Sequence, residues 1–490
     1  MSFAKLDELC RIHSAIDHAQ AILGADEATH MASGGGEERA SAMGRLAAMS
    51  HEMLTAPEVA DWIAAARQEN LDPDQQAAVR EFARVHANMT ALTAQFVERQ
   101  TNARMRSEQL WRKLRPNGDW KGFEPALSEL LELAREEASM RGAALGLDPY
   151  DALIEQHDPG SRAGEIEKIF AELKQFLVDF VPEAEEAGRR RKAPNGLREF
   201  PVEAQRELGI HLMKAVGFDF EHGSLSVSVH PFCGGVPTDV RITTRYRNGD
   251  FLSALMGVLH ETGHALYEQN LPRKWHHWPS GRARGMAMHE SQSLFSEKQI
   301  GRNPAFWRFA LPFVREKLGV DWTIEEIVAA VLEVKRGLIR VDADEVTYPL
   351  HVILRFELER ELISGSLSVR DIPQAWDEKM KANFELSTID DPKDGPMQDV
   401  HWPAGVFGYF PSYTLGALLA AQQWQAVVKA LPDVETDIAA GRFDRINDWR
   451  RDNIWSQASV RSADEITRKA TGSALNAQPF IEHLKERYGA

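Results

Sequence analysis

Cysteine is almost absent from the sequence, since Cys10 and Cys233 are the only two among 490 residues. Two cysteines cannot build a disulfide framework, and neither lies in a spacing typical of metal ligands. We therefore expect both to be reduced thiols and the protein to be cytoplasmic.

Long apolar runs are also missing. A helix that crosses a bilayer needs about 20 consecutive apolar residues, and no run approaches that length. The chain starts MSFAKLDEL, which is charged and amphipathic and does not fit a secretory signal peptide. These features predict that the protein does not associate with membranes.

Positive charge is in deficit, with 57 Lys and Arg against 73 Asp and Glu and a formal net charge of −16. A nucleic-acid-binding protein usually presents a basic face, so this balance argues against that partner. The densest basic run, 189–192, lies between Gly188 and Pro194 and is interpreted as an exposed loop.

What is present is typical of a large globular protein. Hydrophobic residues make up 43% and charged residues 27% of the chain. A chain of 490 residues forms one large domain or two intimate ones. We expect a single domain over 1–490, with a helical part at about 1–220 and a second part at about 221–490 that carries the chemistry.

The first part has helical periodicity almost throughout. Apolar residues repeat at helical spacing from Leu6 to Ile16, before a glycine-rich loop at 34–36. Residues 74–115 contain neither Gly nor Pro and carry one apolar stripe, which predicts one long helix or two nearly continuous ones. Further helices are expected near 122–146, 162–180 and 201–215.

The periodicity changes at Ser224. Residues 224–230 alternate strictly, with Leu225, Val227 and Val229 on one face, which predicts a half-buried strand. A turn at 234–237 leads to a second β-rich run at 239–246. The sequence therefore predicts a mainly α fold with a small antiparallel β ribbon, after which helices resume at Asp250.

A metal-binding motif, HETGH, occupies residues 260–264. Asp250 can cap a helix that runs without proline to Pro272, so His260 and His264 share one face, with about 5–6 Å between their Cβ atoms. Two imidazoles at that separation can converge on one zinc ion, while Glu261 points aside, where it can reach a water molecule as a general base.

Three residues compete as the third ligand. Glu268 lies on the same helix, about 12 Å of axial rise beyond His260, so one ion cannot reach both. His289 and Glu290 are adjacent on the next predicted helix, 286–300, and cannot both face the metal. We select Glu290, because its face also carries Ser293 and Glu297, which could support the ligands from behind.

The sequence resembles the carboxypeptidase Taq family of zinc metallocarboxypeptidases. Six segments carry the resemblance in the family's order, and they are HPF at 230–232, DVRIT at 239–243, HETGH at 260–264, HESQ at 289–292, IRVDAD at 339–344 and GYFP at 408–411. The resemblance implies a mainly helical, cleft-bearing homodimer with a short sheet beside the active site. It also implies removal of single C-terminal residues from peptides with broad tolerance, with His260, His264 and Glu290 as zinc ligands and Glu261 as base.

Two further roles follow from the expected chemistry. The developing oxyanion needs a donor besides zinc, and His230 and Tyr409 are both candidates. A carboxypeptidase also needs a fixed cation for the terminal carboxylate. Arg340 is the first choice, on a helix expected to run from Thr323 to a kink at Pro349.

Arg241 on the ribbon is the second choice for that cation. The competing interpretation is that either arginine pairs with a nearby carboxylate, such as Asp239 or Asp342. The run at 239–246 could also hold the peptide as an added strand.

Several other residues have ordinary interpretations. The segment WHHW at 275–278 is expected to form a loop that covers the site, and His401-Trp402 to order the loop that leads to Tyr409. Asp342 and Asp344 either bond a ligand histidine or are simply polar surface.

Two other functions remain open from the sequence. One is a zinc oligopeptidase or endopeptidase with the same metal core. A cation that binds the terminal carboxylate of the substrate would distinguish a carboxypeptidase from these enzymes. The other is a structural zinc protein, but such sites usually have four protein ligands, commonly including cysteine. The expected cofactor is one zinc ion per chain, with cobalt or manganese as possible substitutes.

Overall fold

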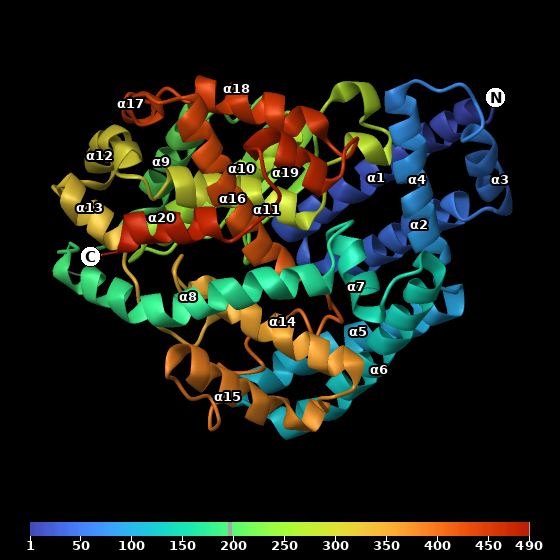
Figure 1. Ribbon diagram of the computed structural model, residues 1–490, viewed down its shortest axis with the longest axis horizontal. Coiled ribbons are helices and arrows are strands. Elements are labelled where there is room, and N and C mark those ends of the chain that lie inside the picture. The colour runs from blue at the N-terminus through green and yellow to red at the C-terminus, as the bar shows by residue number, and fades with distance from the viewer. Residues whose placement is uncertain (195–197, 490) are drawn as a thin grey trace.

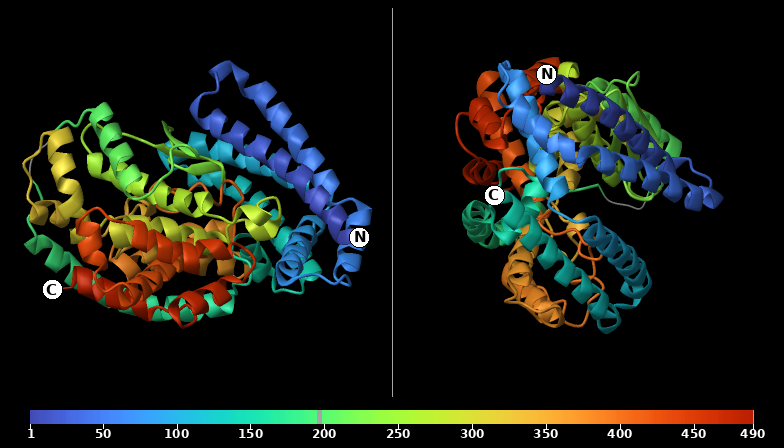
Figure 2. Two further views of the ribbon diagram at one scale, coloured as in Figure 1. Left: turned by 90° about the horizontal axis from the view of Figure 1, so that it is seen from above. Right: turned by 90° about the vertical axis from the view of Figure 1, so that its right-hand side faces the viewer.

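The computed structural model describes residues 1–194 and 198–489. Figures 1 and 2 show a mainly helical molecule with one small sheet, as predicted. In chain order, the helices before the sheet are α1 (Ser2–Thr29), η1 (Ser33–Gly35), α2 (Gly36–Leu54), α3 (Pro57–Ala66), α4 (Pro73–Thr90), α5 (Ala94–Leu114), η2 (Arg115–Asn117), α6 (Trp120–Leu145), α7 (Pro149–His157), α8 (Ala163–Arg190) and α9 (Val202–Ala215).

The helices after the sheet carry most of the chemistry-bearing motifs. They are α10 (Phe251–Gln269), η3 (Arg273–Trp275), η4 (Pro279–Gly281), α11 (Met286–Leu294), the π-helical η5 (Phe295–Ile300), α12 (Pro304–Leu318), α13 (Ile324–Val331), η6 (Arg340–Asp342), α14 (Tyr348–Ser364), η7 (Val369–Asp371), α15 (Ile372–Phe384), α16 (Pro411–Ala430), α17 (Val434–Ala439), α18 (Asp444–Asn453), η8 (Trp455–Gln457), α19 (Ala463–Thr471) and α20 (Gln478–Tyr488). No described helix is both long and apolar enough to cross a bilayer.

The glycine- and proline-free stretch forms two helices, α4 and α5, which is one of the two predicted outcomes. A short non-helical segment at 91–93 separates them, and Thr93 caps α5 by accepting a hydrogen bond from the Phe96 amide. The α1–α2 hairpin projects from the rest of the molecule (Figure 2). The long helix α8 contacts α14 and α20 (Figure 1).

The buried apolar residues form one large cluster and three smaller ones. The large cluster runs from α6 to α20. The smaller cluster at the N-terminal end joins α1, α3 and α4 to Trp278, which is fully buried and stacks on Phe3. Asp7 accepts hydrogen bonds from the Trp278 indole and from His277. The 275–278 segment therefore anchors the N-terminal helices to the chain that follows α10.

The sheet has three strands in the order β1-β3-β2. Strands β2 (Cys233–Val236) and β3 (Asp239–Thr244) pair antiparallel, as the ribbon prediction requires. Strand β1 (Gly223–Val227) adds to β3 in parallel, so the sheet is mixed rather than a simple ribbon. Because β3 is paired on both sides, the run at 239–246 cannot take an added peptide strand as predicted. The edge strands are β1 and β2.

The predicted half-buried face of β1 is wrong. Val227 is 54% and Val229 73% exposed, and the strand ends at Val227. The apolar face of the sheet comes instead from β3, where Val240 and Ile242 are fully buried against α10. This packing places the sheet beside the helix that carries HETGH.

The helix expected to run from Thr323 to a kink at Pro349 does not exist. The capping box of Thr323 and Glu326 is present, but α13 ends at Val331. The backbone amides of Lys335 and Arg336 then donate to carboxylates of Asp344 and Glu185 instead of to helical carbonyls. Pro349 lies in the first turn of α14, where its missing N–H costs nothing.

Candidate metal centre

The α10 helix forms where the sequence predicts it. Asp250 caps it by accepting from the Ser253 amide, and His260 and His264 follow on one face. The Nε2 atoms of His260 and His264 lie 3.7 and 3.5 Å from the two carboxylate oxygens of Glu290 on α11. Potential ligand atoms of these three residues all lie within 4.8 Å of one another, a separation that one ion can bridge.

Two glycines permit the helices to approach this closely. A Cβ at Gly263, inside HETGH, would lie 2.3 Å from the carbonyl oxygen of Gln292 on α11. A Cβ at Gly416 on α16 would lie 2.7 Å from Cβ of Glu290. Both positions therefore exclude a side chain, and the close packing of α10, α11 and α16 brings Glu290 to the histidines.

The outer nitrogens of both histidines have partners of their own. Nδ1 of His260 lies 3.0 Å from Glu297, a residue expected from sequence to support the ligands. Nδ1 of His264 lies 2.6 Å from Nδ1 of His289, whose Nε2 lies 2.8 Å from Glu268. With both Nδ1 atoms engaged, the two Nε2 atoms are the ones left for a metal. Glu268 and His289, rejected as ligands, thus support a ligand from behind.

The charges around the histidines act in opposite directions. Burial lowers the pKa of His264 to about 4. Burial also lowers the pKa of His260, but the carboxylates of Glu290 and Glu297 outweigh it and raise that pKa to about 9. A metal at this site therefore has to displace a proton from His260.

Glu261 lies beside the three ligands and is 7% exposed. Burial raises the pKa of its carboxyl to about 7, with a further contribution from the charge of Glu290. The neighbouring β2 strand is close, because the charges of Glu268 and Glu261 add to burial in raising the pKa of Cys233. Glu261 thus lies near β2 and, in the metal-free site, titrates near neutral pH.

Asp158 organises the start of α11. It accepts a hydrogen bond of 2.6 Å from the Ala287 amide and another from the Ser412 hydroxyl on α16. It is fully buried by its surroundings, and burial raises its pKa to about 6. Asp158 therefore links the helix of Glu290 to the helix that follows Tyr409, a role that no sequence pattern indicated.

The two candidate oxyanion donors differ in their positions. Tyr409 is partly buried, its ring lies 5.0 Å from that of His157, and burial followed by the charge of Glu290 raises its pKa. His230 is exposed, and its backbone carbonyl, not its imidazole, accepts hydrogen bonds from Ser228 and Thr243. Of the two candidates, Tyr409 is therefore the one whose pKa responds to the charge of Glu290.

The loop before Tyr409 is held by buried polar contacts. Glu359 on α14 accepts from the Tyr150 hydroxyl, the Trp402 indole and the Gly408 amide at 2.8, 2.8 and 2.9 Å. Burial raises the pKa of Glu359 to about 7. These contacts support the interpretation that the His401-Trp402 segment orders this loop.

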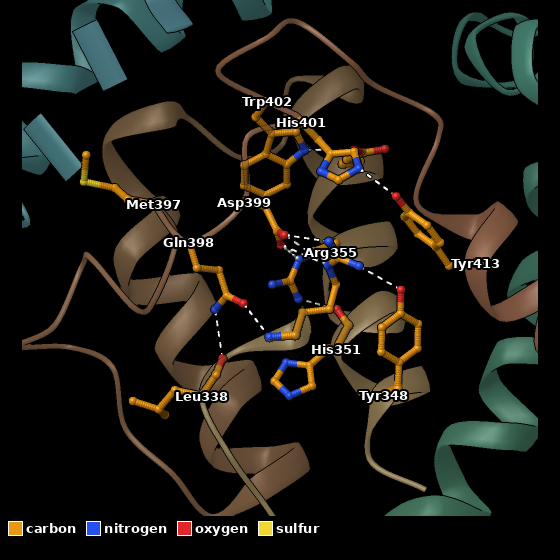
Figure 3. Close-up of polar contacts among 12 residues, drawn as sticks. Leu338, Tyr348, His351, Arg355, Met397, Gln398, Asp399, His401, Trp402 and Tyr413 are labelled. Carbon is orange, nitrogen blue, oxygen red and sulfur yellow. Dashed lines mark hydrogen bonds and ion pairs between the residues drawn. The ribbon is translucent and has the colours of Figure 1, made fainter. Parts of the chain in front are cut away.

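Arg340 lies in η6 and is 5% exposed. Its Nε and Nη2 atoms donate to Asp399 at 3.1 and 2.8 Å, and Nη1 donates to the Tyr348 hydroxyl at 2.7 Å. Figure 3 shows Asp399 with Arg355, Tyr348 and Tyr413 around it. Arg340 therefore has a carboxylate partner, but this is Asp399, 59 positions away, and not Asp342.

Three other predicted residues lie outside the ligand group. Arg241 forms an ion pair with Asp239 at 2.8 Å, as the competing interpretation has it. Asp344 accepts from the backbone amides of Val346 and Thr347, so it caps a turn and bonds no ligand histidine. Asp342 is exposed.

A cavity of about 1040 Å³ opens behind His264. Its walls come from α1, from β2 and the turn after it, and from the 273–283 segment, and Glu268 and His289 line it as well. β2 thus lines open space on the side of Glu268 and His289, the residues behind His264, and this space is large enough for several peptide residues. His260, His264, Glu290 and Glu261 are not among the lining residues.

Comparison with known proteins gives one consistent answer. The model of the carboxypeptidase Taq (M32) metallopeptidase family matches residues 5–488. The chain is 40% identical to thermostable carboxypeptidase 1 of Thermus thermophilus, over 95% of this chain and 94% of the relative, and 33% identical to carboxypeptidase 1 of Bacillus subtilis, over 98% and 97%.

Solved structures agree with these relatives. Metallocarboxypeptidase 1 of Trypanosoma cruzi superposes with a TM-score of 0.98 at 38% identity, covering 99% of each chain. The M32 carboxypeptidase of Deinococcus radiodurans superposes with a TM-score of 0.93 at 35% identity, covering 99% of this chain and 98% of the other.

Proposed function

This chain belongs to the carboxypeptidase Taq (M32) metallopeptidase family and is a metallocarboxypeptidase, and from that premise we propose that it is a zinc enzyme of broad specificity. In this proposal it releases single residues from the C-termini of peptides, with Glu261 as the general base. The convergence of His260, His264 and Glu290 beside a buried glutamate is the observation that carries the proposal.

His260, His264 and Glu290 would hold the ion through two Nε2 atoms and one carboxylate. Zinc bound there supplies the Lewis acidity that activates water and polarises a carbonyl. Two imidazoles and a carboxylate are an open set of three ligands, which is typical of catalytic rather than structural zinc. One ion per chain is expected, and cobalt or manganese could replace zinc.

Glu261 takes a proton from the attacking water and passes it to the leaving amine. Its carboxyl group is buried beside the proposed ligands, a position from which it can accept and return a proton. The Tyr409 hydroxyl donates to the developing oxyanion. Its burial and its sensitivity to the charge of Glu290 favour it over the exposed His230.

Arg340 receives the terminal carboxylate of the peptide. Asp399 accepts from Nε and Nη2 and the Tyr348 hydroxyl accepts from Nη1, so each Nη keeps one further N–H that can donate to a substrate carboxylate. Tyr348 has its pKa raised by burial and also by the charge of Glu290, which supports a position of this cluster near the proposed ligands. Arg241 is the second candidate, but its pairing with Asp239 favours Arg340.

The rest of the peptide lies along the free edge of β2. That edge lines the cavity of about 1040 Å³, whereas β3 has no free edge. Backbone hydrogen bonds to an added strand hold a peptide without reading its side chains, which suits broad specificity.

The experiment compares a free-acid peptide with its C-terminally amidated twin. The zinc-loaded protein should shorten the free acid by one residue at a time, while the amidated peptide should remain almost intact, as followed by mass spectrometry. Arg340→Ala should lose most activity on the free acid, and Arg241→Ala should lose little. Internal cleavage of both peptides at comparable rates would establish the oligopeptidase alternative instead.

We also propose that the enzyme is a cytoplasmic homodimer. The resemblance to the family and the two reduced cysteines support this part of the proposal. Light scattering coupled to size-exclusion chromatography would measure the mass in solution, and a mass of 55.0 kDa would mean a monomer.

A further inference from the structure

A second arginine shares the carboxylate that pairs with Arg340. Arg355 on α14 is fully buried, and its Nε donates to Oδ2 of Asp399 at 2.5 Å. Its Nη1 donates to the carbonyl oxygen of His351 at 2.6 Å. Figure 3 shows Asp399 beside the Arg355 guanidinium, with Tyr348 and Tyr413 on one side and Gln398 and Leu338 on the other.

The charges of this cluster do not cancel. Two guanidinium groups share one carboxylate, which leaves one positive charge in excess. Burial lowers the pKa of Arg355 only to about 10, so it is a cation at neutral pH. Burial and the charge of Arg340 lower the pKa of His401 to about 3. Burial and the charge of Arg355 also lower the pKa of His351. Both histidines are therefore neutral.

Within residues 1–194 and 198–489, no acidic side chain other than Asp399 forms an ion pair with either guanidinium. The Arg340 guanidinium lies over the rings of Tyr413, Phe410 and Tyr348, and that of Arg355 over Trp376 and Phe410. Glu359 lies one turn along α14, and the charge of Arg355 affects its pKa. Its carboxylate accepts hydrogen bonds from Tyr150, Trp402 and Gly408 and not from Arg355. Its pKa of about 7 leaves it only partly ionised at neutral pH.

An isolated Arg340–Asp399 pair would be neutral and would attract an anion weakly. We infer that Arg355 is a positioning residue for substrate recognition, which shares Asp399 so that Arg340 keeps a net positive charge toward the terminal carboxylate of the peptide. Asp399 also fixes the orientation of Arg340, because it accepts from both Nε and Nη2, while one further N–H on each Nη can still donate to the substrate. The inference rests on the proposed role of Arg340.

The test compares neutral and charged replacements of Arg355. Arg355→Gln and Arg355→Met remove the charge, and Arg355→Lys retains it. On a free-acid dipeptide substrate, the neutral variants should raise KM about ten-fold or more with kcat nearly unchanged, because a buried unit charge acts strongly over a few ångströms. The lysine variant should recover most of the wild-type KM.

Arg450→Met is the matched control. Arg450 is also fully buried, with its guanidinium between Phe295 and Trp455, but it shares no carboxylate. Its replacement should lower the thermal unfolding midpoint without the selective rise in KM. Unfolding midpoints and zinc content of all variants show whether each is folded and loaded.

The outcomes separate this inference from the proposed function. If Arg340→Ala leaves KM for the free acid unchanged, the proposed role of Arg340 fails. If Arg340→Ala raises KM but folded Arg355→Gln does not, only the inference about Arg355 fails. Failure of both neutral variants to fold, or an equal loss of kcat and zinc, would assign Arg355 a structural role and overturn the inference.

Discussion

The Nδ1 atoms of His264 and His289 lie 2.6 Å apart, and Nε2 of His289 lies 2.8 Å from Glu268. Nε2 of His289 must donate to the carboxylate, so its Nδ1 is the acceptor and Nδ1–H of His264 the donor. That assignment leaves the lone pair of His264 Nε2 directed toward Glu290. Glu268, too far along α10 to share an ion with His260, therefore sets the tautomer of the proposed ligand His264.

Replacing Glu290 and Glu268 should separate a ligand from its support. Glu290→Ala should lose zinc on dialysis against a weak chelator, because it removes one of three ligands. Glu268→Ala should keep a metal content close to wild type, and competitive titration should find its affinity lower by about ten-fold, the usual effect of losing such support. Equal loss of metal from both variants would make Glu268 a ligand.

Glu261→Gln should keep the fold and the metal while lowering kcat by several orders of magnitude. The amide is nearly isosteric with the carboxyl group but cannot accept a proton from water. Steady-state kinetics with metal analysis on the same preparation provide the measurement. Loss of zinc from this variant would show that Glu261 is itself a ligand.

Tyr409→Phe and His230→Ala should have unequal effects on the chemical step. Loss of one oxyanion donor typically lowers kcat by about 10²–10³, and we expect this for Tyr409→Phe. The exposed His230 should be nearly silent. Kinetics on one free-acid peptide compare the two directly, and the reverse order would transfer the role to His230.

Glu359→Gln should change how stability depends on pH. Burial raises the pKa of the folded carboxyl to about 7, above its ordinary value of 4.5, so the folded state binds the proton more tightly than the unfolded state. The contribution of Glu359 to the free energy of unfolding of the wild type therefore falls as pH rises from about 4.5 to about 7, and it is constant above that range.

The glutamine variant lacks this proton, so it should gain stability relative to wild type over the same range, by an amount on the order of 3 kcal/mol. Denaturant unfolding at pH 5 and pH 8 measures the difference. An identical gap between variant and wild type at both pH values would contradict the assignment.

Much of the site could be predicted because it is local. HETGH lies on one helix whose period places two histidines and a glutamate at known angles, and Asp250 supplies the cap that the sequence indicates. Glu290 could be chosen over His289 because adjacent helical residues face different directions. The mixed sheet could not be predicted, since the periodicity of β1 does not say which strand it pairs with.

The same limit explains two differences at Arg340. The helix expected from the Thr323 cap to Pro349 ends early, because carboxylates from elsewhere satisfy the amides of Lys335 and Arg336. The competing interpretation paired Arg340 with a neighbour in sequence such as Asp342, whereas Asp399 approaches from a separate loop. No spacing rule relates residues whose contact depends on how distant segments pack.

The sequence by itself determined the helical class, through its apolar period, and the family, through the resemblance of its motifs. It also predicted a ligand set and a base, because HETGH places those side chains on one helix. Only the tertiary structure decided what controls that chemistry. The relay from Glu268 through His289, the cap that Asp158 provides for α11, and the Asp399 shared by Arg340 and Arg355 all join segments far apart in the chain. The reason is physical, because helical period acts over a few residues, while burial and charge act between whatever side chains the packing brings together.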